Sequence, residues 1–164
     1  MINFSDFNLT SLFKEVDGIF DKFNEEEMPC ECYGWRSWMI EKTFAKHSNG
    51  KLTKLKNKNG RDFLSLEKDG LSYEFKQVKD AFKNNITPSI VLKNFRGRCM
   101  GKSKKTFDYL IVMDVDRKIL GMFDWEYVDT VSKVNDATIT AQLSKEYAVQ
   151  IETISNGLSD LLGD

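Results

Sequence analysis

Residues 61–76 read RDFLSLEKDGLSYEFK and decide the fold of this 164-residue chain. Apolar and polar residues alternate on both sides of Asp69-Gly70, and this dipeptide favours a tight turn between two strands. We therefore predict a β-hairpin here. Successive side chains of a strand point to opposite faces, so Glu74 and Lys76 (the Glu-X-Lys pair) share one face and Phe75 lies on the other.

The loop of the hairpin decides whether Asp62 joins the Glu-X-Lys pair. A plain two-residue turn would pair Lys68 with Leu71. The ladder would then place Asp62 opposite Gln77, on the face away from the Glu-X-Lys pair.

A three-residue loop over 68–70, with its glycine left-handed in a bulge, gives the other register. Glu67 then pairs with Leu71, and Asp62 lies across from Lys76 on the face of the Glu-X-Lys pair. Directly opposed side chains approach within roughly 5 Å and diagonal ones within about 7–8 Å. A site that includes Asp62 therefore predicts this longer loop or an equivalent bulge.

In that register the side chains suit a divalent cation. Asp62 and Glu74 are hard oxygen ligands of the kind that Mg²⁺ prefers, and the backbone carbonyl of Phe75 adds a third oxygen. Lys76 would hold or help deprotonate a metal-bound water beside a scissile phosphate, because the metal lowers the pKa of that water. Partial desolvation beside the metal would make Lys76 itself easier to deprotonate.

The pattern resembles a known family. An Asp in one strand, a turn, and Glu-X-Lys in the next strand, with a helix before and a helix and buried strand after, is similar to the PD-(D/E)XK nucleases. Among these the chain most resembles small type II restriction endonucleases. Its motif residues are Asp62, Glu74 and Lys76, and Arg61 stands where the family commonly has proline. The resemblance implies a Mg²⁺-dependent, site-specific endonuclease that hydrolyses double-stranded DNA, with a common core over about residues 35–124.

The resemblance also points to a further carboxylate. Helices that precede the hairpin in this family often contribute one, and Glu41 is the residue that would do so here. The alternative is that Glu41 is a surface helix residue paired with a neighbour such as Lys42.

Charge is segregated along the chain although the net charge is −1. Residues 42–61 hold seven basic and no acidic side chains, and residues 93–105 hold six basic and none acidic. Clustered Lys and Arg suit a polyanion such as DNA, although they could equally be solvated faces. The residues expected to contact DNA are Lys54, Lys56, Lys58, Arg61, Arg96, Arg98, Lys102, Ser103, Lys104 and Lys105.

The order of predicted elements indicates a single α/β domain over residues 1–164. We expect a restriction-endonuclease-like core, a mixed central sheet of about five strands flanked by helices. The predicted helices are residues 4–23 (beginning near Asn8 or Thr10), Trp35–His47, a helix that starts at Thr87-Pro88-Ser89 and ends before Gly101, and stretches over 125–131, 143–149 and 154–162. The predicted strands are Lys51–Lys56, Asp62–Glu67, Leu71–Val78, Phe107–Val115 (buried on both faces) and Lys118–Asp124.

The remaining features concern location and assembly. No apolar run approaches a membrane span and the N-terminus lacks a signal-peptide pattern, so we expect a cytoplasmic protein. As a site-specific endonuclease the chain would act on a palindromic DNA site. Such a site requires two-fold symmetry of the protein, so we expect a homodimer. The Leu- and Phe-rich N-terminal helix would either form the dimer interface or close the core.

The cysteines leave two readings open. Three cysteines in that compartment argue against a disulfide framework. Cys30, Cys32 and Cys99 could join His47 in a zinc site, or they are ordinary thiols and His47 is an exposed residue of a lysine-rich stretch.

Two rival functions remain at this stage. The chain could be a structure-specific, repair or homing nuclease of the same fold. It could also be a non-catalytic nucleic-acid-binding module, and that reading predicts Asp62 turned away from Glu74.

Overall fold

A computed structural model describes the chain over residues 1–25, 33–56, 62–78, 89–93, 105, 107–135 and 138–154. The elements follow in the order η1 (Phe4–Asp6), α1 (Leu9–Glu25), α2 (Tyr33–His47), β1 (Lys51–Lys56), β2 (Asp62–Lys68), β3 (Leu71–Val78), β4 (Ser89–Lys93), β5 (Tyr109–Asp114), β6 (Ile119–Asp124), α3 (Trp125–Thr130), β7 (Ser132–Asn135), β8 (Thr138–Gln142), η5 (Lys145–Tyr147) and β9 (Gln150–Thr153). Within these ranges, no helix combines the length and apolarity needed to cross a membrane.

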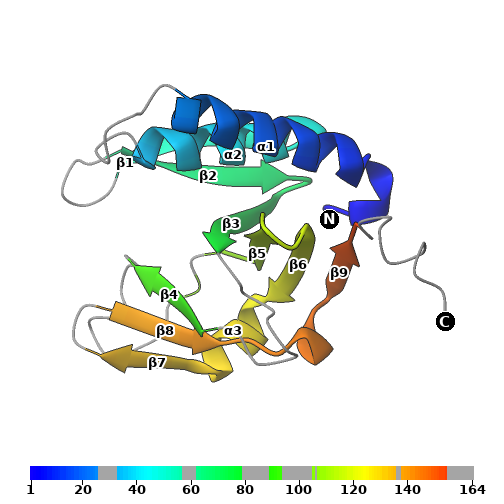
Figure 1. Ribbon diagram of the computed structural model, residues 1–164. Coiled ribbons are helices and arrows are strands. Elements are labelled where there is room, and N and C mark those ends of the chain that lie inside the picture. The colour runs from blue at the N-terminus through cyan, green and yellow to red at the C-terminus, as the bar shows by residue number, and fades with distance from the viewer. Residues whose placement is uncertain are drawn as a thin grey trace, which may run out of the picture.

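The architecture is α/β with a mixed central sheet. Six strands form this sheet in the order β1-β2-β3-β5-β6-β9, with β3 and β5 parallel and the other neighbours antiparallel. A second, antiparallel sheet has the order β4-β8-β7. Figure 1 shows α1 and α2 side by side above the central sheet, and both the second sheet and α3 below the central sheet.

Both faces of the central sheet are buried. The face under α1 and α2 forms one apolar cluster, which includes Ile40, Phe44, Leu66, Tyr73, Phe75, Ile111 and Met113. The opposite face forms a second cluster with α3 and β8, which includes Leu110, Val112, Phe123, Trp125, Val128 and Ala141. Strand β5 contributes alternate residues to each cluster, which confirms the prediction of a central strand buried on both faces.

The N-terminal helix closes the core. Asn8 caps it, because its side chain accepts a hydrogen bond from the backbone N–H of Ser11 at 2.9 Å, as the sequence predicted. Its apolar side chains, including Leu12, Phe13 and Val16, are buried. The apolar side of this helix therefore fills the core, which is one of the two roles expected for it. That side is not available for the other role, a dimer interface.

One predicted helix is wrong. Residues 89–93 form strand β4, which pairs with β8 from Ser89↔Gln142 to Lys93↔Thr138. The short apolar run after Pro88 fits either state, and β-branched Ile90 and Val91 favour a strand once a partner is present. Pairing with a distant segment therefore overrides the local helix-start pattern.

The C-terminal third also differs from the prediction. The expected helix over 143–149 is only the short η5, and the strands β7, β8 and β9 were not predicted. Strand β9 is a sixth strand at the edge of the central sheet, beyond the expected core of about residues 35–124. Most of the helix expected over 154–162 lies outside the described residues.

The hairpin has the plain two-residue turn. Lys68 pairs with Leu71, and both turn residues are left-handed, with φ of 55° at Asp69 and 76° at Gly70. Turns of this kind match the right-handed twist of the flanking strands. The prediction of a longer or bulged loop, on which a site that includes Asp62 depended, is therefore wrong.

The left-handed turn makes a testable demand on Gly70. Gly70→Ala should lower the free energy of unfolding by about 1–2 kcal/mol, because an L side chain is strained at positive φ. Gly18→Ala is the matched control, since an added methyl there meets nothing within 4 Å and lies in α1. It should raise the free energy of unfolding by roughly 0.5–1 kcal/mol. Urea denaturation measures both, and equal effects would contradict the turn.

Candidate functional site

Strand β3 places the Glu-X-Lys pair on one face, as predicted. Glu74 lies opposite Leu110 of β5 and Lys76 opposite Val112, on the face away from α1 and α2. Nζ of Lys76 lies 2.5 Å from Oε1 of Glu74. The two side chains are 28% and 33% exposed, so the ion pair is partly shielded from water.

Phe75, between these two residues, points the other way. Its ring contacts that of Phe44 in α2, with the ring centroids 5.2 Å apart. Phe44 is fully buried. This contact fixes α2 against β3, and Glu41 lies one helical turn before Phe44.

Glu41 meets the Glu-X-Lys pair. The pKa of Glu41 is raised to about 7: burial is the main cause, the negative charge of Glu74 adds to it, and the positive charge of Lys76 partly offsets both. Glu41 is thus a partly buried carboxyl within electrostatic range of Glu74 and Lys76. A second carboxyl group therefore lies within electrostatic range of the Glu74–Lys76 ion pair, near the contact between α2 and β3.

Asp62 lies on β2, where its backbone pairs with Lys56 of β1. The ladder between β2 and β3 comprises only three pairs and ends at Leu66↔Tyr73. Figure 1 shows β3 turning away from β2 beyond the hairpin. Both predicted positions for Asp62, opposite Gln77 or opposite Lys76, assumed a full-length ladder, and that assumption is wrong.

The side chain of Asp62 is outside the part of the chain that the structure describes, so its place in the site stays a prediction. Among the side chains that are described, no three from His, Cys, Asp and Glu gather into a metal site. Glu41 and Glu74 supply two carboxylates, and the carbonyl of Phe75 lies between Glu74 and Lys76 in the chain. A divalent cation at this point would therefore need Asp62 or water to complete its ligands.

The expected DNA contacts are described only in small part. The backbones of Lys54 and Lys56 lie in β1, and Lys105 is half exposed with its Nζ 2.8 Å from Oδ1 of Asp108. Asp108 also accepts hydrogen bonds from the backbone N–H and hydroxyl of Ser72. The other expected contacts lie outside the described residues: Lys58, Arg61, Arg96, Arg98, Lys102, Ser103 and Lys104.

His47 is not the exposed residue that the sequence predicted. Its side chain is only 12% exposed, and its Nε2 lies 3.1 Å from Oε1 of Glu15 in α1. Packing of α1 on α2 covers it. Of the proposed zinc ligands, the three cysteines lie outside the described residues.

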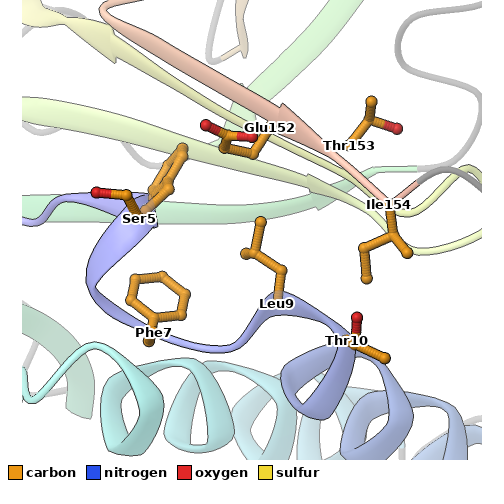
Figure 2. Close-up of a pocket in the computed structure, with 8 residues that line it drawn as sticks. Ser5, Phe7, Leu9, Thr10, Glu152, Thr153 and Ile154 are labelled. Carbon is orange, nitrogen blue, oxygen red and sulfur yellow. The ribbon is translucent and has the colours of Figure 1, made fainter.

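The hollow drawn in Figure 2 lies apart from the candidate site residues. It has a volume of about 390 Å³ and is formed where the N-terminal segment meets β9. Ser5, Phe7 and Leu9 line one side, and Glu152 and Ile154 line the other. None of the candidate site residues takes part in it.

Comparisons of the chain with protein-family models, with curated proteins and with solved structures found no match. The chemistry of the site itself is then the guide to function. Two carboxyl groups held together repel one another when both are ionised, and a cation or a shared proton relieves that repulsion. An amine beside them can hold water or an anionic substrate.

The raised pKa of Glu41 predicts a pH-dependent stability. Between pH 4.5 and about 7 the folded protein holds this proton more tightly than the unfolded chain does. Stability therefore falls as the pH rises through this window, and the loss is complete above it. Glu41→Gln should remove this loss of stability. The free energy of unfolding of the variant minus that of the wild type should therefore grow by on the order of 2–3 kcal/mol between pH 4.5 and pH 8 without divalent metal.

Urea denaturation at the two pH values measures this difference. Glu15→Gln is the control, because Lys46 and His47 hold the pKa of Glu15 below its usual range. That variant should gain nothing on the alkaline side. An advantage of Glu41→Gln that is equal at both pH values would contradict the burial of Glu41 beside Glu74.

Proposed function

We propose that this chain is a Mg²⁺-dependent endonuclease that hydrolyses phosphodiester bonds of double-stranded DNA. The observation that carries the proposal is the Glu74–Lys76 ion pair on one face of β3, with the partly buried Glu41 within electrostatic range of both residues. A partly buried carboxyl group with a raised pKa, within electrostatic range of a second carboxylate, is a place where a divalent cation gains more than at a lone exposed carboxylate. An amine within 2.5 Å of one carboxylate adds the third group that phosphodiester hydrolysis needs.

The order of elements around the site supports the same proposal. Helix α2 precedes the β1-β2-β3 meander, β5 then runs parallel to β3, and β6 returns antiparallel. This succession is similar to the restriction-endonuclease-like core of the PD-(D/E)XK nucleases that the motif resembles. The motif residues Asp62, Glu74 and Lys76 would then have their family roles.

Each residue has a definite task in this proposal. Glu41, Glu74, Asp62 and the carbonyl of Phe75 would hold the cation. When bound, Mg²⁺ would supply positive charge that stabilises the phosphate oxygens as the bond to the leaving oxygen breaks. Lys76 would release Glu74, hold the attacking water by its Nζ, and align that water with the phosphorus.

The finer reading is a sequence-specific type II restriction enzyme that acts as a homodimer on a palindromic site. The basic block over residues 42–61, which continues from α2 into β1, supports DNA as the polyanion. A structure-specific, repair or homing nuclease of the same fold is the alternative. A non-catalytic nucleic-acid-binding module would keep the Glu74–Lys76 ion pair as a purely structural contact.

Cleavage is the direct test. With plasmid DNA and Mg²⁺, the wild-type protein should nick or linearise the substrate, and EDTA should abolish this. Glu74→Gln and Lys76→Ala should each lower the rate by at least about 100-fold, since each removes a group that acts on the reacting phosphate. Glu15→Gln, which alters a carboxylate of α1 that is paired with Lys46, should keep full activity. Full activity in Lys76→Ala would refute the proposed chemistry.

Metal binding gives a second test that does not depend on finding the substrate. Mg²⁺ should raise the melting temperature of the wild-type protein at pH 8, because it relieves the repulsion between Glu41 and Glu74. The rise should be absent or much smaller in Glu74→Gln and unchanged in Glu15→Gln. Equal rises in all three proteins, measured by scanning calorimetry, would place the metal elsewhere and favour the non-catalytic alternative.

A further inference from the structure

Helix α2 presents two open tryptophan rings on its outer side. Trp35 is 70% exposed and Trp38 is 42% exposed. They lie three residues apart, so they are neighbours on the same stripe of the helix. Together with Gly34 they line a hollow of about 370 Å³. Rings of this size seldom stay exposed in pairs unless they meet a partner.

Positive charge lies beside these rings, and Glu15 of α1, which lines the hollow at Trp38 together with Lys42, is held in an ion pair by Lys46. Nζ of Lys42 lies 5.1 Å from the centre of the Trp38 ring, and Arg36 lies over the ring of Phe20 on α1 at 4.6 Å. The only acidic residue of α2 is Glu41, whose carboxyl group is shielded at the candidate site. Aromatic faces flanked by positive charge complement a partner that combines flat rings with anionic groups.

The spacing also suits a nucleic-acid strand. Three residues of helix separate the two tryptophans by a rise of about 4.5 Å, and a further rise of about 4.5 Å leads from Trp38 to Glu41. Successive bases of a stacked strand are roughly 3.4 Å apart. A strand that stacks on the two rings would therefore run along the outer side of α2.

We propose that Trp35 and Trp38 form a stacking platform for unpaired bases, and that the substrate has a single-stranded segment next to a duplex. This inference rests on the proposed nuclease function and narrows its substrate. In a continuous duplex the faces of the bases are already stacked on one another, so a protein ring cannot use them. A flap, a fork, a junction arm or an overhang exposes such faces. The platform therefore favours a structure-specific enzyme over one that reads uniform duplex.

The chain carries its own probe for this test. Of its three tryptophans, only Trp125 is buried, in the apolar cluster beneath α3. Quenching of tryptophan fluorescence by bases would therefore report mainly on Trp35 and Trp38. The full-length protein is titrated in EDTA with a dT20 oligonucleotide and with a blunt duplex of the same length, and binding of fluorescein-labelled versions is followed by anisotropy.

We expect dT20 to quench the fluorescence and the blunt duplex to leave it nearly unchanged. The double substitution Trp35→Ala and Trp38→Ala should weaken dT20 binding by at least about tenfold and duplex binding by less than twofold. The double substitution to Phe should retain most of the affinity, because a ring remains. Tyr147→Ala is the matched control, since Tyr147 is 61% exposed on η5 and should not affect binding.

Three results would overturn the proposal. One is equal binding of both DNAs that the double Ala variant does not change. Another is a concentration-dependent dimer in sedimentation that the double Ala variant abolishes, which would make the rings an interface between two copies. The third is strong binding of an uncharged apolar peptide in place of dT20.

Because these titrations contain no metal, they are independent of cleavage. If Glu74→Gln binds dT20 normally and no protein cuts any DNA with Mg²⁺, the platform stands and the nuclease proposal fails. If the protein cuts blunt duplex as fast as flapped DNA, the nuclease stands and the platform fails.

Discussion

The contact between Phe44 of α2 and Phe75 of β3 is the interaction on which the candidate site depends. Burying an aromatic ring contributes on the order of 1.5–3 kcal/mol to stability. This contact joins α2 to β3, the strand that pairs in parallel with the distant strand β5. The same packing fixes two directions. Because Phe75 points into the core, its neighbours Glu74 and Lys76 point to the opposite face of β3, and Glu41 of α2 stays within electrostatic range of both. An apolar contact thus holds the polar groups in place.

The site is electrostatically unfavourable in the absence of a ligand. Glu41 lies within electrostatic range of the Glu74–Lys76 ion pair, and burial together with the charge of Glu74 raises its pKa to about 7. Two other carboxylates of the described residues have cationic partners: Glu15 pairs with both Lys46 and His47, and Asp108 pairs with Lys105 and accepts a hydrogen bond from the backbone of β3. A carboxyl group whose pKa is raised by burial and by a second carboxylate is typical of sites that bind or react.

The sequence predicted the first half of the fold well and the second half poorly. Alternation and the Asp69-Gly70 turn fixed the hairpin, and Asn8 marked the start of α1, because these signals are local. Strand β4 was predicted as a helix since a short apolar run fits both states until its partner β8 is known. Strand β9 escaped because it is short, largely exposed and lies at a sheet edge, where neither face demands an apolar pattern.

By itself the sequence determined that Glu74 and Lys76 share a face, because strand geometry alternates whatever the rest of the chain does. It could not determine the surroundings of that pair. Tertiary structure decided that Glu41 lies beside it, since this follows from the packing of α2 on β3. Tertiary structure also decided that β2 and β3 separate beyond Leu66, so that alternation along the hairpin no longer governs Asp62. Local geometry follows from neighbouring residues, whereas convergence depends on which distant surfaces bury one another.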